Sequence, residues 1–126
     1  DNEDFGKALR WADKAISLIK NDGSGYGQKG KVYYKAWDNF RQNPLTIDDR
    51  IIASLAYENF LKAEKLKYRG FNKAKWLKEN SKDVLYGKAQ WFMADEKVKR
   101  AGKIQPISSI YDWATDFITA KGDWKN

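Results

Sequence analysis

The sequence contains neither cysteine nor histidine, and these two absences exclude several kinds of chemistry. Without cysteine the chain has no disulfides, no thiolate metal ligands and no cysteine nucleophile. Without histidine it lacks the commonest general base and the commonest transition-metal ligand. We therefore expect a protein that is not an enzyme and that uses neither a cofactor nor a metal ion.

Long apolar runs are also absent. No run approaches the ~18 residues that a membrane-spanning helix needs, so no membrane span is expected. A length of 126 residues predicts one domain, residues 1–126. The formal net charge of +7 favours acidic partners such as nucleic acid, an anionic membrane or an acidic protein surface. However, acidic residues lie between the lysines along most of the chain, an arrangement that is also typical of an ordinary solvated surface.

Apolar residues recur through most of the chain with the spacing of one helix face, and no stretch alternates long enough to indicate a strand. Pro44 ends the second helical pattern, because the residue before a proline is disfavoured in helical conformation. Thr46 and Asp49 have the spacing of a capping box at the start of a third helix. The sequence therefore predicts an all-α fold, with helices near residues 4–20, 24–42, 47–67, 72–100 and 107–120.

The number of helices is left open between five and six. Asn80 and Asp83 are candidate cap residues inside 72–100, so this range forms either one long helix or two. In the last expected helix, Phe117 and Ile118 share an apolar face with three residues before them.

Three glycines, Gly25, Gly27 and Gly30, spell the G-x-G-x-x-G pattern of dinucleotide-binding loops. That site needs a strand before the glycines and a parallel strand after the helix, and neither is predicted. Gly27 to Gly30 also match the G-x-x-G loop of KH nucleic-acid-binding domains, which needs a β-sheet. A glycine inside a helix costs about 1 kcal/mol relative to alanine. We therefore expect a neighbouring helix to approach closely at Gly30, between Tyr26 and Tyr33.

The order Tyr26, Gly30, Tyr33, followed by the segment AYENFLKA, resembles the tetratricopeptide repeat. This repeat is a pair of antiparallel helices of about 34 residues that stacks into a right-handed superhelix. The first segment resembles the second helix of a preceding repeat, and a following repeat would start near Lys82. The link containing RQNPLTIDD is longer than in the family, and Tyr68 stands where the family has its closing proline.

The resemblance implies a non-catalytic scaffold that binds a protein or peptide on the concave face, which the first helix of each pair lines. It implies the candidate partner-binding residues Lys31, Tyr34, Lys35, Tyr86, Gln90 and Met93. Lys31 and Lys35 are one helical turn apart, so they favour an acidic segment. The resemblance also implies self-association or a longer repeat array, with Trp76 and Trp124 as contacts if they are exposed. It favours an extracytoplasmic location, as in exported proteins of Bacteroidetes.

The alternative hypothesis is a basic helical domain that binds nucleic acid through lysine, arginine and exposed aromatic residues. It predicts a clustered basic face and a steep loss of affinity with salt. For an enzyme, Asp112 and Asp116 have the spacing to share a metal ion, but two ligands are too few to indicate a site.

Overall fold

The computed structural model describes residues 2–70 and 72–125, and the protein is mostly helical. The described residues contain six α-helices, two short strands and three 3-10 turns. They are α1 (Asn2–Leu18), α2 (Gly23–Phe40), α3 (Ile47–Lys65), α4 (Lys73–Asn80), η1 (Lys82–Val84), α5 (Lys88–Phe92), α6 (Glu96–Ala101), β1 (Lys103–Ile104), η2 (Ser109–Tyr111), β2 (Ile118–Thr119) and η3 (Gly122–Lys125). The expected all-α class is confirmed in this coarse form.

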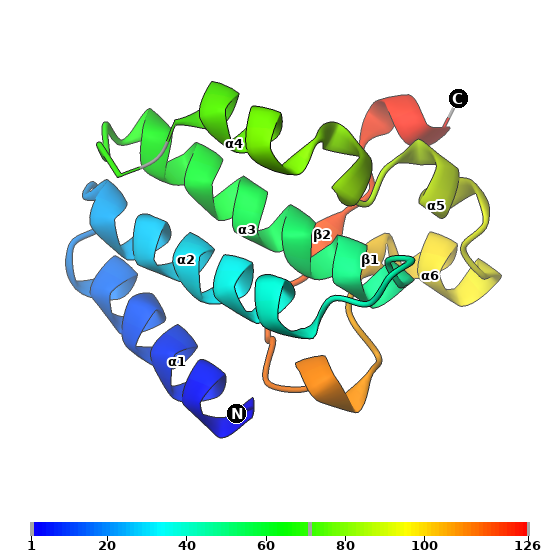
Figure 1. Ribbon diagram of the computed structural model, residues 1–126, viewed down its shortest axis with the longest axis horizontal. Helices are drawn as coiled ribbons and strands as arrows, with labels where there is room; N and C mark the ends of the chain where they lie inside the picture. The colour runs from blue at the N-terminus through cyan, green and yellow to red at the C-terminus, as the bar shows by residue number, and fades with distance from the viewer. Residues whose placement is uncertain (1, 71, 126) are drawn as a thin grey trace.

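Helices α1, α2 and α3 lie side by side in one layer, and each runs opposite to its neighbour (Figure 1). The expected helices 4–20, 24–42 and 47–67 match their bounds to within two residues at every end. The predicted capping box is confirmed at the start of α3. There the Thr46 hydroxyl accepts from the Asp49 backbone N–H, and the Asp49 carboxylate accepts from the Thr46 backbone N–H, each at 3.0 Å.

The glycines of α2 lie where neighbouring side chains come closest to its backbone. A Cβ added to Gly30 would lie 2.6 Å from the Phe60 ring of α3, and a Cβ on Gly25 would lie 2.8 Å from Ile16 of α1. Gly27 similarly faces the ring of Tyr68. The close approach expected at Gly30 is therefore confirmed. The G-x-G-x-x-G pattern lies within a helix that follows another helix, which is not the setting of a dinucleotide-binding loop.

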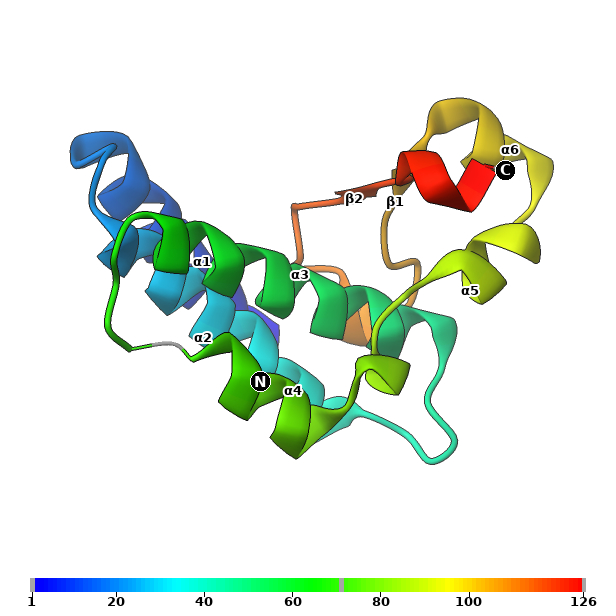
Figure 2. The same ribbon diagram turned by 90° about the horizontal axis from the view of Figure 1, so that it is seen from above.

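Two segments cover the layer from opposite sides. Figure 2 shows α4 on one side and β1 with β2 on the other. On the first side, the Trp76 ring of α4 stacks on Tyr57 of α3 with 5.0 Å between centroids. On the second side, Trp113 stacks against Phe5 of α1 at 5.3 Å and against Tyr33 of α2 at 5.7 Å.

Residues 72–100 form neither one helix nor two. They contain α4, α5 and α6, with the 3-10 turn η1 between the first two. Helix α4 ends at Asn80, because the φ of 65° at the next residue, Ser81, leaves the helical region. Gly87 is extended before α5, and the Asp95 carboxylate caps α6 by accepting from the Val98 backbone N–H. Local turn and cap chemistry thus divides a segment whose apolar period alone predicts a longer helix.

The expected helix over 107–120 is wrong. This range contains the turn η2 and the strand β2, whose Ile118 pairs with Ile104 of β1 in an antiparallel ladder. Phe117 is 41% exposed whereas Ile118 is 3% exposed, so the two do not share a buried face. The physical reason is competition for the backbone, because the β1–β2 ladder pairs Ile118 and Thr119 with β1 at positions that a helix would bond internally.

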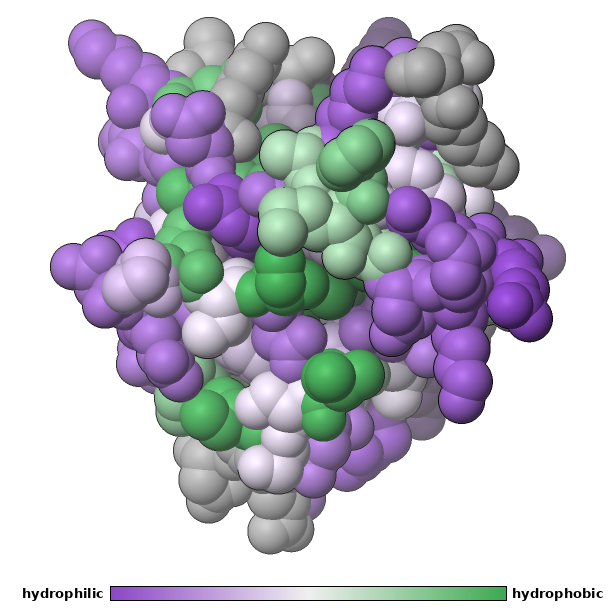
Figure 3. All heavy atoms as spheres, turned by 90° about the vertical axis from the view of Figure 1, so that its right-hand side faces the viewer, coloured by the Kyte–Doolittle hydropathy of each residue, from purple (hydrophilic) through white to green (hydrophobic). Residues whose placement is uncertain are grey.

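The tryptophans proposed as contacts are not free surface groups. Trp76 is 6% exposed, and Trp124 packs against Tyr86 and Trp91. At the end of the molecule that holds α5 and α6, the large exposed apolar side chains include Phe92 and Met93. Figure 3 shows this end, with apolar groups gathered among hydrophilic ones. None of the described helices combines the length and the apolar character that crossing a bilayer requires.

Replacing Gly30 tests the packing of α2 on α3. Overpacking a core costs about 1–3 kcal/mol, whereas the gain in helix propensity from glycine to alanine is about 1 kcal/mol. We expect Gly30→Ala to lower the free energy of unfolding modestly and Gly30→Leu to lower it more, as measured by denaturant titration.

The matched control is Gly6→Ala in α1, where the nearest atoms lie 3.4 Å from an added Cβ. This variant should be as stable as the parent or more stable. A Gly30→Leu variant with the parent's unfolding midpoint would contradict the close packing.

Candidate functional site

Lys31 and Lys35 lie one turn apart on the exposed face of α2, and both side chains are exposed. They border a groove between α1 and α2 with a volume of about 540 Å³, which we call the α1–α2 groove. It is lined by Asp4, Phe5 and Ala8 from α1 and by Lys31, Val32, Lys35, Asn39 and Phe40 from α2. The two sequence-predicted lysines are therefore brought together at the rim of one groove.

A second hollow lies on the other side of Lys31, and we call it the α2–α4 pocket. Its volume is about 350 Å³, and aromatic side chains from three helices, Tyr34, Phe60 and Trp76, contribute to its lining. Polar side chains, including Lys31, Lys75 and Glu79, complete it. Lys31 thus lines both hollows and stands on the ridge between them.

Tyr34 is less available than the sequence suggests. The centroids of the Tyr34 and Trp76 rings lie 6.3 Å apart in an edge-to-face arrangement. The Tyr34 hydroxyl donates to the Asn80 side chain at 3.2 Å. These contacts hold α4 against α2. Tyr34 therefore forms part of the wall of the α2–α4 pocket instead of a free apolar platform.

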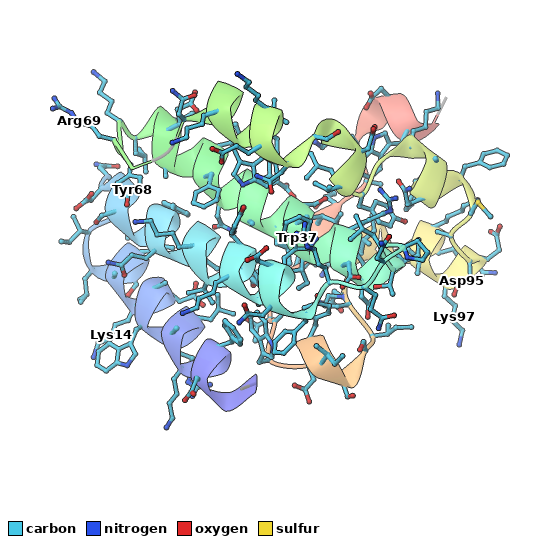
Figure 4. The ribbon with its side chains drawn as sticks, in the orientation of Figure 1. Lys14, Trp37, Tyr68, Arg69, Asp95 and Lys97 are labelled. Carbon is cyan, nitrogen blue, oxygen red and sulfur yellow. The ribbon has the colours of Figure 1, made fainter. Side chains whose placement is uncertain are left out.

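Lys31 already has an intramolecular partner. Its ammonium donates to the Tyr68 hydroxyl at 2.9 Å and lies 5.6 Å from the centroid of the Tyr68 ring. Tyr68 follows α3, at the end of the layer marked in Figure 4. Because Gly27 has no side chain, the Tyr68 ring can lie on α2 there. Apart from the glycine, no local pattern in the sequence predicts this contact.

The other three predicted site residues lie elsewhere, and none of them lines either hollow beside Lys31. Tyr86 is 5% exposed and packs against Trp124. The Gln90 side chain accepts from the Gly87 backbone N–H at 2.8 Å, at the start of α5. Met93 is 84% exposed, beside Phe92. The segment after α4 contacts α3 through η1 and through the Tyr86 backbone N–H, which donates to the Ser54 hydroxyl at 2.8 Å.

A partly buried ionic cluster that the sequence did not predict joins α1, α2 and the C-terminal segment. Lys29 is 8% exposed, and its ammonium donates to Asp13 at 2.6 Å and to Asp116 at 2.9 Å. The Tyr33 hydroxyl donates to the other oxygen of Asp116. Lys29 and Tyr33 are one turn apart, but Asp116 is 87 positions away from Lys29 in sequence, so only the folded chain reveals the cluster.

Both donors of this cluster are held in their protonated forms. Burial lowers the pKa of Lys29, but hydrogen bonds to Asp13 and Asp116 and their negative charges outweigh it, so the pKa is raised. Burial, together with the hydrogen bond to Asp116, raises the pKa of Tyr33. A general base or an amine nucleophile must lose its proton easily. The cluster is therefore suited to tethering the C-terminal segment and not to proton transfer.

Asp116 therefore has two partners within the chain, Lys29 and Tyr33. Asp112, the other half of the considered pair, is exposed. In residues 2–70 and 72–125 no group of three or more acidic side chains is placed to hold a metal.

Asp116→Ala should destabilise the protein, because it leaves the buried Lys29 with one carboxylate and removes the partner of Tyr33. Loss of a buried hydrogen-bonding partner costs about 1–3 kcal/mol. Denaturant titration should show this loss, and limited proteolysis should show faster cleavage within residues 112–122.

Asp112→Ala removes an exposed carboxylate from the same segment and should change stability by less than about 0.5 kcal/mol. Equal stability of the two variants would show that the cluster does not hold the segment.

Glu58 of α3 supplies a pH-dependent test. Burial raises its pKa above the ordinary 4.5, although Lys121 and Lys62 act in the opposite direction. The folded state thus binds this proton more tightly than the unfolded state. The carboxyl favours folding below its unfolded pKa, and this advantage is lost as the pH rises through the folded pKa.

Glu58→Gln should therefore raise the melting temperature near pH 7, and the difference from the parent should disappear at about pH 4. Glu64→Gln, at an exposed position on the same helix, makes the same charge change and should show no comparable gain. A Glu58→Gln variant that melts below the parent near pH 7 would contradict this prediction.

Comparisons with protein-family models, with curated proteins and with solved structures found no match to this chain.

Proposed function

We propose that the protein is a non-catalytic scaffold that binds an acidic peptide or protein segment across the exposed face of α2. The tetratricopeptide-like order of antiparallel helices supports this proposal, since such stacks bind partners on the face that their first helices line. The observation that carries it is the position of Lys31 between two hollows, with Lys35 one turn further along the same rim.

The α1–α2 groove has the chemistry for an amphipathic segment. Phe5, Val32 and Phe40 give it apolar lining, and burying apolar surface there would contribute about 25 cal/mol per Å². Lys31 and Lys35 add positive charge at the rim, which orients a partner and speeds its association more than it raises affinity. The partner that fits combines apolar side chains with flanking carboxylates.

The spacing of the two lysines sets the spacing of those carboxylates. Four residues of α-helix advance about 6 Å along the axis. Two residues of an extended strand advance about 6.7 Å. An extended segment with acidic residues at alternate positions therefore presents its carboxylates to Lys31 and Lys35 together, with the intervening side chain on the opposite side.

The α2–α4 pocket would extend the site beyond Lys31. Its lining of Tyr34, Phe60 and Trp76 is suited to one further apolar or aromatic side chain. The Lys31 ammonium has three N–H donors and gives one to the Tyr68 hydroxyl, so it can bind a carboxylate while it keeps this contact.

A random-peptide display library selected against the parent protein tests this proposal. We expect the selected peptides to be enriched in aspartate and glutamate together with an apolar residue. A selected peptide, synthesised with a fluorescent label, should bind the Lys31→Glu, Lys35→Glu variant about tenfold or more weakly than the parent by fluorescence anisotropy.

The matched control is Lys97→Glu, Arg100→Glu, which makes the same charge change one turn of α6 apart, at positions exposed at the opposite end of the molecule (Figure 4). The affinity of this control variant for the selected peptide should equal that of the parent. Selected peptides without an acidic preference, or equal weakening by both double variants, would reject the site.

A further inference from the structure

Three polar side chains of α2 lie in one row along the α1–α2 groove. Lys31, Lys35 and Asn39 follow one another at intervals of four residues, and all three line the groove. Side chains with this spacing form a single ridge on a helix surface. All three are exposed, so a bound segment can reach them from solvent. The proposed peptide binding uses the two lysines, and the row continues beyond them to Asn39.

The Asn39 side chain has no hydrogen-bonding partner among residues 2–70 and 72–125, although its neighbour Asp38 pairs with Arg41 at 3.6 Å. Its carboxamide offers an oxygen that accepts and an NH₂ group that donates. Helix formation favours alanine or lysine over asparagine. Asn39 therefore contributes a polar group that α2 itself does not need.

The length of the row matches an extended segment. From Lys31 to Asn39 the helix advances about 12 Å, and four residues of an extended strand advance about 13 Å. Alternate side chains of such a strand point to the same side. The first, third and fifth residues of one segment can therefore face Lys31, Lys35 and Asn39. The second and fourth then face the α1 side of the groove, which contains Phe5 and Ala8.

The charge at the Asn39 end of the groove differs from that at the lysine end. Asp4 lines this end, because the first turn of α1 meets the last turn of α2, where Phe5 packs on Phe40. A carboxylate at the fifth position would face the negative charge of Asp4. An apolar side chain there would leave the Asn39 carboxamide without a partner in the segment. A carboxamide carries no charge and can exchange two N–H···O hydrogen bonds with Asn39.

We propose that Asn39 is a specificity-determining residue of the α1–α2 groove and selects asparagine or glutamine two positions beyond the second acidic residue of an extended segment. The partner is then a segment of the pattern acid, apolar, acid, apolar, amide, in order from Lys31 to Asn39. This inference rests on the proposed peptide binding and names the class of segment that the same groove accepts.

Three fluorescently labelled peptides test this assignment by fluorescence anisotropy. Each has glutamate at the first and third positions and leucine at the second and fourth, and the fifth is glutamine, leucine or glutamate. Because a strand presents the same side chains in either chain direction, each peptide is also made in reverse order, and the tighter-binding order is used. We expect the parent to bind the glutamine peptide about fivefold more tightly than the other two, as hydrogen bonds of modest net strength allow.

Two substitutions of Asn39 then identify the recognising group. Asn39→Ala removes the carboxamide and should bind the glutamine and leucine peptides equally. Asn39→Lys extends the lysine row and should prefer the glutamate peptide to the glutamine peptide about fivefold. Alanine and lysine both favour a helix more than asparagine does, so both variants should fold.

The matched control is Asn21→Lys, which adds the same charge at an exposed position in the turn before α2. This variant should keep the parent's order of preference among the three peptides. A reversal of preference in Asn39→Lys that Asn21→Lys does not share would show that the position of the added charge matters, and not the charge alone.

Equal binding of the glutamine and leucine peptides by the parent, or a preference that persists in Asn39→Ala, would overturn the role of Asn39. The proposed peptide binding would still stand if the Lys31→Glu, Lys35→Glu variant binds the same peptides more weakly than the parent. Peptides that bind the parent no more tightly than this double variant would overturn both proposals. A preference of Asn39→Lys for the glutamine peptide would contradict the expected register.

Discussion

The fit of α3 side chains into the glycine positions of α2 is the constraint on which the rest of the structure depends. Phe60 occupies the space that a side chain at Gly30 would fill, and a Cβ on Gly23 would lie 2.7 Å from the Ala63 carbonyl oxygen. This closeness fixes the layer of α1, α2 and α3, because α1 packs on the other side of α2. The exposed rim that carries Lys31 and Lys35 is positioned by it. The glycines of α2 therefore serve the close packing of the helices.

Carboxylates of the layer determine the path of the C-terminal segment. The Asp48 side chain accepts from the Ile107 and Ser108 backbone N–H groups at 3.0 and 2.6 Å, and Asp49 accepts from the Tyr111 hydroxyl at 2.7 Å. These contacts lead the chain past α3, so that Trp113 can stack between Phe5 and Tyr33 and Asp116 can reach Lys29. Acids at the first turn of a helix are common because they complement its dipole. Here the same acids also bind a distant part of the chain.

The sequence predicts the first half of the fold well because the signals there are local. Helical periodicity and the Thr46–Asp49 capping box depend on residues within one or two turns of each other, and the structure confirms both. Residues 107–120 show a helical period too, but the pairing of Ile118 with the distant Ile104 overrides it. All six candidate site residues came from the repeat resemblance. Lys31, Tyr34 and Lys35 share one helix and line neighbouring hollows, whereas Tyr86, Gln90 and Met93 depend on how distant segments pack and line neither hollow.

The distribution of charge connects the fold with the proposed peptide-binding surface. Among the described residues the buried charged side chains are Lys29, Asp48 and Asp49. Asp13 and Asp116 accept from Lys29, whereas Asp48 and Asp49 accept from backbone N–H groups and from the Tyr111 hydroxyl. This buried set is net negative, so the remaining surface is more cationic than the formal charge of +7 indicates. Folding requires the acids in these positions, but it does not require Lys35 at the rim of the α1–α2 groove. Cations that the fold leaves at apolar surfaces are the groups most suited to meeting an anionic partner.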